Sequence, residues 1–461
     1  MVVLDATVVN IALPSAQKAL GFSDGNRQWI ITAYSLAFGS LLLPFGRVGD
    51  LFGRKLTLLI GLVGFSVVSA IAGASQSFGV LVGTRALQGM FGALLAPSAL
   101  SLLTTTFTDP RERGTAFGIY GAIAGGGGAI GLLLGGVLTE YLSWRWCLYV
   151  NVVIAVPAIF AALALLTNQV PEHRPKLDWP GTITASAGLF GIVFGFSQAE
   201  PRGWGDPVTL GALAAGVVLL VVFVMIERRS SHPLLPLRIV LDRNRGGSYL
   251  SVLISGAGIF AVFLFLTYFL QINRGYSPVT TGVAFLPMVG AIVVMSTSSN
   301  AILLARVGPR PLVFTGMLLA ACGMLILTQL DENSSYAGHI LPALIVTGLG
   351  LGLIFAPSIS TATLGVDPAD AGVASATVNS CQQVGGSIGT SFLNTMATTA
   401  TATFLSGKLP TRANAAQAAL HGYTVAFWWA AGIFAVGALV ALLLLRPGAT
   451  QPSLEPQPVV A

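Results

Sequence analysis

The chain has 461 residues, of which 54% are apolar and only 9% are Asp, Glu, Lys or Arg. A soluble domain carries about 25% charged residues, so this composition excludes an ordinary water-soluble globular protein. The net charge of +6 comes from basic residues dispersed over short loops, which excludes a basic nucleic-acid-binding face and favours a membrane protein oriented by its positive loops.

Apolar stretches of bilayer-spanning length follow one another along the chain. A helix of about 20 apolar residues is long enough to cross the hydrocarbon core of a membrane. The 55 glycines favour helices that pack closely within it. The predicted spans are 1–20, 28–46, 55–74, 78–106, 115–139, 144–167, 180–197, 208–226, 247–270, 280–304, 311–330, 338–362, 373–405 and 422–445. The sequence therefore predicts an all-α, polytopic membrane protein of 14 transmembrane helices.

Basic residues in the loops predict the orientation of these helices. With the N-terminus in the cytoplasm and successive helices alternating, 15 of the 23 Lys and Arg residues lie on the cytoplasmic side and 7 on the outer side, while Arg85 lies within the membrane. Cytoplasmic loops of membrane proteins carry an excess of Lys and Arg. We therefore expect both termini to be cytoplasmic.

An internal repeat relates the two halves of the chain. The stretch 92–98 (GALLAPS) recurs at 352–358 (GLIFAPS), and Asp-Pro at 109–110 and a glycine-rich stretch at 127–131 recur 258 residues later. Duplicated halves are typical of secondary transporters, whose substrate site lies between the repeats. We expect a six-helix bundle over 1–170, a cytoplasmic linker and two extra helices over 171–230, a loop and second six-helix bundle over 231–446, and a disordered cytoplasmic tail over 447–461.

Asp5 and Arg85 are the two ionisable residues that fall well inside predicted spans. An ionisable residue within a membrane is a functional candidate, and two opposite charges facing one cavity lower the cost of burying each other. We expect them to lie close together, with Asp5 taking up and releasing a proton as a conformational change alters its solvation and its distance from Arg85. The alternative is a purely structural pair that fixes helix packing. The repeat counterpart of Arg85 is Ile345, so the charge is confined to one half, whereas a structural pair would be expected in both halves.

The segment 46–55 (GRVGDLFGRK) is predicted to be a tight cytoplasmic turn between the second and third helices. Its glycines permit the turn, Asp50 can accept hydrogen bonds from a helix N-terminus, and Arg54 can bridge to a neighbouring helix. We interpret the segment as a latch for one conformation. The alternative is a generic charged loop.

The predicted fifth helix is unusually rich in glycine. A helix of this kind can pack closely and bend, which favours a pivot that seals the cavity, although ordinary small-residue packing explains the same composition. The glycines are Gly118, Gly121, Gly125, Gly126, Gly127, Gly128, Gly131, Gly135 and Gly136.

At these residues the chain resembles the fourteen-span drug:proton antiporter branch of the major facilitator superfamily, over nearly its whole length. The first-helix stretch 4–14 (LDATVVNIALP) resembles the first-helix motif of that branch. Residues 144–146 (WRW) and Asn151 also resemble residues of the family. The loop motif of the superfamily is matched by Gly46, Asp50, Gly53, Arg54 and Lys55. The fourth-helix motif, whose Arg is implicated in proton transfer, is matched by Arg85, Gln88 and Gly89. The fifth-helix antiporter motif is matched by Gly118, Gly127, Gly131, Gly135 and Gly136.

The chain departs from the family pattern at several positions. Leu132 stands where the antiporter motif usually has Pro, and Leu51 and Gln382 stand where basic residues are common. Only four residues precede Asp5, where family members usually have more apolar residues, so we expect a longer natural N-terminus. Without the proline, the resemblance does not imply a bend in the fifth helix, and with Gln382 the second half lacks one possible positive charge.

The resemblance implies a proton-driven exporter of drug-like molecules in the bacterial cytoplasmic membrane. We expect a monomer that is not an enzyme, has no cofactor besides the proton gradient, and has a small molecule, protons and the lipid bilayer as partners and no nucleic acid. With one acid in the membrane, neutral or monocationic substrates are favoured over dications. Polar and aromatic walls suit such ligands, although each aromatic can equally pack in the core or against lipid. The expected cavity residues are Thr7, Asn10, Tyr34, Gln88, Phe263, Tyr268, Asn379, Gln382 and Gln383.

Three other functions fit parts of the pattern. A nutrient importer on the same fold is disfavoured by the antiporter-type glycines, whereas an exporter of a lipid, an endogenous metabolite or a self-made antibiotic is not distinguished from a drug exporter. A membrane enzyme is disfavoured because the four His residues lie in loops and the spans hold no catalytic constellation. The sequence has no GxxxxGK[ST] motif, so we do not expect ATP to drive transport.

Overall fold

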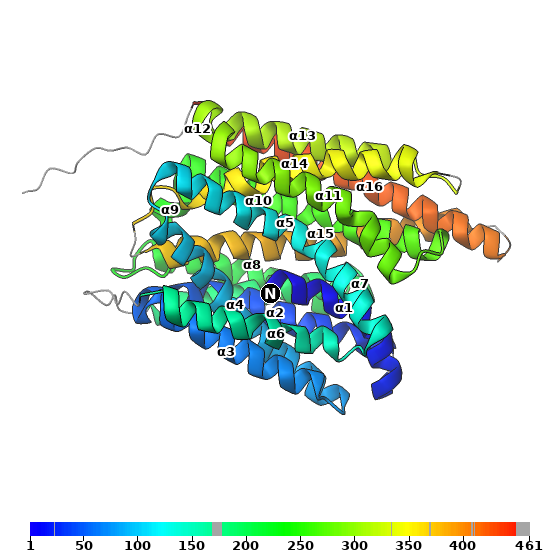
Figure 1. The fold of residues 1–461 in the computed structure, drawn as a ribbon, viewed down its shortest axis with the longest axis horizontal. Helices are drawn as coiled ribbons and strands as arrows, with labels where there is room; N and C mark the ends of the chain where they lie inside the picture. The colour runs from blue at the N-terminus through cyan, green and yellow to red at the C-terminus, as the bar shows by residue number, and fades with distance from the viewer. Residues whose placement is uncertain are drawn as a thin grey trace, which may run out of the picture.

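The computed structural model describes residues 1–22, 24–167, 178–332, 334–367, 370–406, 409 and 411–448, and in these residues the ordered elements are all helical. Figure 1 shows the long helices running side by side along the long axis of the molecule. The helices are α1 (Val2–Leu20), α2 (Asp24–Phe52), α3 (Arg54–Gly73), α4 (Phe78–Thr106), α5 (Pro110–Tyr141), α6 (Trp146–Leu165), α7 (Trp179–Arg202), α8 (Pro207–Glu227), α9 (Leu237–Leu241), α10 (Arg243–Ala261), α11 (Pro278–Ser298), α12 (Leu304–Val307), α13 (Pro309–Leu327), α14 (Leu341–Thr363), α15 (Ala371–Leu405) and α16 (Arg412–Leu444). Four π-helical turns, η1 (Val262–Leu266), η2 (Phe269–Asn273), η3 (Ser299–Leu303) and η4 (Tyr336–Ile340), extend α10, α11 and α14.

Within the described residues, eleven helices are long and apolar enough to cross a membrane. Their outer faces expose large apolar side chains such as Val153, Phe160 and Val218, as a lipid-facing surface requires. The chain is therefore a multi-pass membrane protein. Three further long helices, α1, α5 and α15, are not among the eleven. α5 and α15 carry many Gly, Ser and Thr residues in place of large apolar ones.

The packing of the helices repeats between the two halves of the chain. In the first half, α1 packs against α5, α2 against α4, and α3 against both α4 and α6. In the second half, α10 packs against α15, α11 against α14, and α13 against both α14 and α16. Pro97 lies within α4 and Pro357 at the matching place within α14.

Two seams join the halves. Along one, α5 packs against α11 and α14; along the other, α2 and α4 pack against α15. The first seam is close because a Cβ atom on Gly118 would stand 2.9 Å from the Cα of Thr297, and one on Gly121 would stand 2.7 Å from the Cβ of Ala356. Glycines at these positions allow the backbones to approach.

The hairpin of α7 and α8 lies beside the second seam. α8 packs on α7, and α7 in turn packs against both α2 and α15. Phe196 of α7 accepts a hydrogen bond at its backbone oxygen from Ser391 Oγ of α15, 2.6 Å away, and Trp204 Nε1 donates to Thr395 Oγ1 at 3.0 Å. The two extra helices are thus fastened to the second half by hydrogen bonds as well as by packing.

The end of α2 and the start of α16 differ most from the sequence-based prediction. The segment 46–55 was expected to be a turn, but α2 continues to Phe52 and the chain bends at Gly53 alone, whose φ is 95°. α16 begins at Arg412, well before residue 422. Both differences have the same cause, because apolar composition marks the part of a helix that avoids water and not the polar turns that extend it. Residues 168–177 and 449–461, which include part of the predicted linker and most of the predicted tail, lie outside the described residues.

Candidate functional site

Asp5 and Arg85 form an ion pair in the interior of the first-half helices. Arg85 Nη1 on α4 lies 2.6 Å from Asp5 Oδ2 on α1, and the two side chains are 2% and 0% exposed. The guanidinium also donates from Nη1 to Gln88 Oε1 at 2.9 Å and from Nε to the backbone oxygen of Ile30 at 3.2 Å. The proximity expected from the sequence is therefore observed. A buried pair is stable only when further hydrogen bonds satisfy its remaining atoms, and this pair has them.

The network around the pair draws in five helices. Asn151 Nδ2 on α6 donates to Asp5 Oδ1 at 2.6 Å, so each carboxylate oxygen has its own donor. Gln88 Nε2 donates to Ser69 Oγ on α3 at 2.6 Å. The ring of Tyr34 on α2 lies against the guanidinium, 4.4 Å from its carbon to the ring centroid.

Two of these residues escaped the sequence-based prediction of the site. Ser69 gave no signal, because single serines are common in membrane helices. Asn151 did give one, since it is the one amide in the otherwise apolar stretch 146–165. Tyr34 and Gln88, which we expected to line a substrate cavity, are 4% and 0% exposed and belong to the ion-pair network in this conformation.

Four other expected cavity residues lie on α1 and in or beside the π-helical turns that follow α10. Thr7 donates its hydroxyl to the Leu4 backbone oxygen at 3.0 Å, and the Asn10 side chain lies outside the described part of the structure. Phe263 packs against the ring of Phe285 with centroids 5.6 Å apart. Tyr268 is 40% exposed and lies near Tyr423. Thr7 and Phe263 both lie against α5, next to Gly131 and Gly128 respectively.

Asn379, Gln382 and Gln383 lie on consecutive turns of α15. Asn379 Nδ2 donates to the Ser375 backbone oxygen at 2.9 Å, and its side chain is nearly buried. Gln383 is half-buried, and a Cβ on Gly39 of α2 would lie 3.4 Å from its Cγ. Gln382 is also half-buried. Gln383 therefore lies near the seam between α2 and α15, where the two halves meet.

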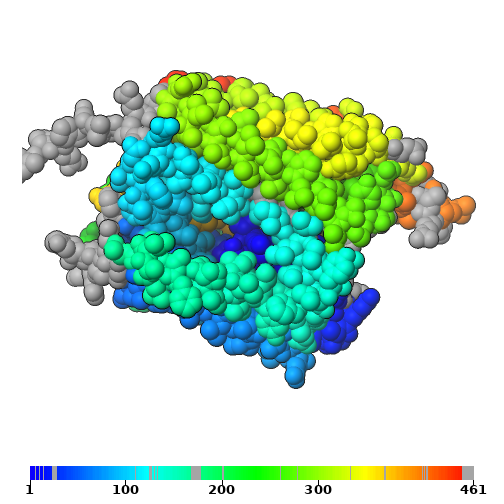
Figure 2. Space-filling model, in the orientation of Figure 1, coloured from blue at the N-terminus to red at the C-terminus, as the bar shows by residue number. Residues whose placement is uncertain are grey.

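The glycines of the fifth-helix motif lie on different faces of α5. A Cβ on Gly118 would meet α11, whereas a Cβ on Gly127 would stand 2.8 Å from Val3 Cγ1 and one on Gly135 would stand 3.0 Å from the Val8 backbone oxygen, both on α1. Gly131 lies against Leu4 and Thr7 of α1 in the same way, and Gly136 is buried. Figure 2 shows α1, in dark blue, recessed in a hollow between α5 and α6. α5 is thus in close contact with both the acid-bearing helix and the second half.

Polar contacts between the halves gather at one end of the helix array, which we call the latch end. Asp50 Oδ1 at the end of α2 accepts a hydrogen bond from the backbone N–H of Gly372, 3.0 Å away in the first turn of α15. Arg54 Nη2 donates to the same oxygen at 3.2 Å. Lys55 Nζ donates to the backbone oxygens of Leu163 and Leu166 at the end of α6. The N-terminus of a helix carries partial positive charge, which favours the Asp50 carboxylate there.

Asp370 is a second centre of the latch end that the sequence did not indicate. Its Oδ1 accepts from Arg47 Nη1 of α2 at 2.9 Å, and its Oδ2 accepts from Arg238 Nη2 of α9 at 2.7 Å. Arg47 Nη2 also donates to the Pro233 backbone oxygen at 3.4 Å. The segment between α8 and α10 therefore joins the contact between α2 and α15.

A third polar link crosses the first seam at the latch end. Arg113 Nη2 of α5 donates to Thr363 Oγ1 of α14 at 3.1 Å. With the contacts of Asp50 and Asp370, this link joins the two halves at the latch end along both seams.

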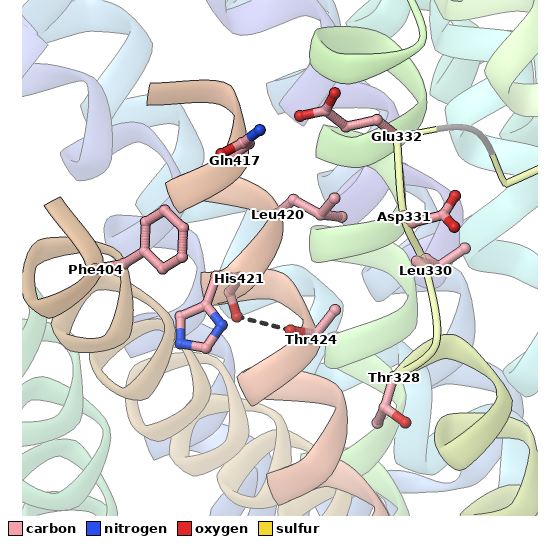
Figure 3. Close-up of a pocket in the computed structure, with 9 residues that line it drawn as sticks. All are labelled: Thr328, Leu330, Asp331, Glu332, Phe404, Gln417, Leu420, His421 and Thr424. Atoms are coloured by element: carbon pink, nitrogen blue, oxygen red, sulfur yellow. Dashed lines mark hydrogen bonds between the residues drawn. The ribbon is translucent and has the colours of Figure 1, made fainter. Parts of the chain in front are cut away.

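The opposite end of the second half carries an open groove of about 470 Å³. Figure 3 shows its lining, which comes from the chain after α13, from the end of α15 and from α16. It includes Asp331, Glu332, Phe404, Gln417 and His421. None of the expected cavity residues lines this groove, and the described residues contain no group of His, Cys, Asp or Glu side chains that could hold a metal ion.

Comparison with known proteins places this geometry in context. Residues 1–390 match the family model described as Major Facilitator Superfamily. The chain is 50% identical over 447 residues to the puromycin resistance protein pur8 of Streptomyces alboniger, covering 96% of this chain and 89% of the relative. It is 39% identical over 401 residues to the cephamycin export protein CmcT of Amycolatopsis lactamdurans, covering 86% of this chain and 82% of the relative. The crystal structure of the human organic anion transporter MFSD10 has a TM-score of 0.62 at 16% identity and covers 95% of this chain and 96% of that one.

Proposed function

Because this chain belongs to the Major Facilitator Superfamily, with antibiotic resistance and export proteins among its relatives, we propose that it is a proton-coupled antiporter that exports small amphipathic compounds. Export proceeds by alternating access across the bacterial cytoplasmic membrane. The transporter needs no cofactor besides the proton gradient and works as a monomer.

The observation that carries this proposal is the fully buried ion pair of Asp5 and Arg85. The guanidinium of Arg85 and the amide of Asn151 both donate to the carboxylate and favour its charged form, while burial favours the protonated one. A rearrangement that lengthens the Asp5–Arg85 distance or changes the hydration of the pair therefore alters how tightly Asp5 holds a proton. A carboxylate poised in this way couples proton movement to conformational change.

The architecture supports alternating access between two bundles. We propose that α1, α5 and α15 complete fourteen spans, that residues 1–170 and 231–446 contain the two six-helix bundles, and that α7 and α8 belong to an inserted hairpin over 171–230. The repeated packing of the halves and the two seams between them support this layout. With both termini in the cytoplasm, the latch end is cytoplasmic and the conformation described above is closed on that side.

The latch and pivot residues are assigned roles on the same basis. We propose that Gly46, Asp50, Gly53, Arg54 and Lys55 hold the cytoplasmic end closed, since Asp50 bonds the N-terminus of α15 across the seam. The glycines of α5 let that helix slide and bend between α1 and α11, where close contacts already exist.

The substrate class follows from the relatives and from the single membrane acid. The relatives include a puromycin resistance protein, a cephamycin export protein and a tetracenomycin C resistance and export protein. With Asp5 serving both the proton and any cationic group, neutral and monocationic compounds are favoured over dications. The amides of Asn379, Gln382 and Gln383 remain the proposed polar contacts for such a compound, with Tyr34, Gln88, Phe263, Tyr268, Thr7 and Asn10.

Transport into proteoliposomes under an imposed pH gradient tests the proposal. Puromycin is the first compound to use, followed by a panel of lipophilic neutral, monocationic and dicationic compounds. We expect Asp5→Asn to abolish gradient-driven transport while neutral compounds still bind. We expect Asp206→Asn to leave transport unchanged, because the asparagine side chain would still cap α8. Undiminished gradient-driven transport by Asp5→Asn would refute the coupling. Export of an endogenous metabolite or lipid is the alternative, and import is tested by the direction of flux in inside-out vesicles.

A further inference from the structure

Asn151 occupies a special place in the network around Asp5. It is fully buried on α6, and its Nδ2 lies 2.6 Å from Asp5 Oδ1, the oxygen that Arg85 does not bind. A carboxylate only accepts hydrogen bonds, so the amide nitrogen must face it. Asn151 is therefore the second donor that stabilises the charged form of Asp5.

The other side of the same amide is unpaired. Asn151 Oδ1 is buried and has no hydrogen-bond partner within the described structure. Rotating the amide by half a turn about its last side-chain bond would break one hydrogen bond, the one to Asp5. A buried amide that is hydrogen-bonded at both its oxygen and its nitrogen would lose bonds on both sides in the same rotation. Among the described residues, no hydrogen bond to Oδ1 holds this amide in one orientation.

A protonated Asp5 needs the opposite partner. Its carboxylic acid carries an O–H that must donate to an acceptor when it is buried. The rotated amide presents Oδ1 at the position that Nδ2 now occupies. In that exchange the carboxylate gains a proton from water entering the bundle, and Asn151 neither gains nor loses one.

We propose that Asn151 is a positioning residue for the proton on Asp5. Its amide donates from Nδ2 to the carboxylate and, after rotation, accepts at Oδ1 from the carboxylic acid. The inference rests on the proposed proton coupling and adds a residue that keeps Asp5 hydrogen-bonded in both protonation states.

Other ionisable groups also face Asp5 and must be separated from Asn151 in any test. They are the amino group of Met1 on the same helix, Tyr34 of α2, Arg85 of α4 and Cys147 of α6. Cys147 lies one turn from Asn151 on α6 and bonds Thr139 of α5. Substituting Cys147 therefore disturbs the same wall without removing a hydrogen bond to Asp5.

The test is a pH titration of the carboxyl group in the full chain by infrared spectroscopy, with Asp5→Asn identifying the Asp5 band. Asn151→Leu keeps the shape and removes both roles of the amide. The lost bond to the charged form outweighs the lost bond to the neutral form, since hydrogen bonds to charged groups are roughly twice as strong. We expect the midpoint of protonation to rise by about one pH unit, a tenfold gain in proton affinity. Cys147→Ala is expected to leave it unchanged.

A second isosteric variant keeps the test decisive if the leucine variant does not fold. Asn151→Asp places a like charge beside Asp5, so the midpoint should rise further than in Asn151→Leu. An unchanged midpoint in either folded variant, or an equal shift in Cys147→Ala, would overturn the inference. If the wild-type protein shows no gradient-driven transport, the proposed function fails. The role of Asn151 is then still decided by how far its substitution moves the protonation midpoint of the Asp5 band.

Discussion

Replacing Gly46 with alanine should open the latch end. Gly46 lies where α2 meets α15, and a Cβ built on it would stand 2.5 Å from Ala376 Cβ and 2.8 Å from the Gly372 backbone oxygen. Carbon atoms in contact stay about 3.5–4.0 Å apart, so the two helices must separate by roughly 1 Å. Because one of the blocking atoms belongs to backbone, a change of side-chain rotamer cannot relieve the overlap.

The size of the effect follows from the cost of overpacking. An extra methyl group in a well-packed interior costs about 1–3 kcal/mol. Here the cost falls only on the conformation in which α2 and α15 touch, so the equilibrium should shift toward the separated conformation by about 5- to 150-fold. Gly49→Ala is the matched control on the same helix, because its Cβ would meet only Ser98 Oγ at an ordinary 3.6 Å.

Distances between two spin labels measure this equilibrium directly. Labels on Leu56 of α3 and Val307 of α12, both 43% exposed, report the separation of the halves at the latch end once the three native cysteines are replaced. We expect a longer-distance population to grow in Gly46→Ala and not in Gly49→Ala. Identical distance distributions in the two variants would show that the close contact of Gly46 does not control closure.

Two further predictions concern burial and hairpin packing. Asp370 binds Arg47, whose side chain is 8% exposed, and Arg238, which is 71% exposed. Removing the buried partner of an ion pair costs about 3–5 kcal/mol, and removing an exposed partner costs about 0–1 kcal/mol. Arg47→Met should therefore enlarge the longer-distance population of the same spin labels far more than Arg238→Met. Equal effects of the two substitutions would contradict this reasoning. Gly191→Ala should lower the thermal unfolding temperature, because its Cβ would stand 2.9 Å from the Cα of a facing glycine on α8. Gly211→Ala is the control and should leave that temperature unchanged, because open space surrounds the position. Equal unfolding temperatures of the two variants would rule out close packing of the α7–α8 hairpin as a source of stability.

The latch end illustrates how far a sequence motif reaches. The segment 46–55 indicated a charged turn that could cap a helix, and Asp50 does bond the first turn of α15. The motif did not indicate Asp370, because its partner Arg47 is 323 residues away and no local pattern connects them. The expected turn was also wrong, since glycines in a polar stretch permit a bend without requiring one. α2 continues to Phe52, and the chain changes direction at Gly53, whose φ is positive.

The substrate cavity shows the opposite limit. Polar and aromatic residues in apolar spans are candidates for lining a substrate cavity, but the sequence does not say which neighbouring helix each side chain faces. Tyr34 and Gln88 therefore lie in the ion-pair network, while Gln383 lies at the seam between α2 and α15.

The sequence by itself determined the membrane class, most of the long helices, the repeat and the need of Asp5 for a nearby cation, because hydropathy and the cost of a buried charge act on each segment locally. Only the tertiary structure decided that Asn151, 146 residues away, supplies the second donor to Asp5, and that Arg238 in the segment after α8 binds Asp370 next to α15. Such pairings depend on which faces of packed helices meet, and close packing in three dimensions selects those faces.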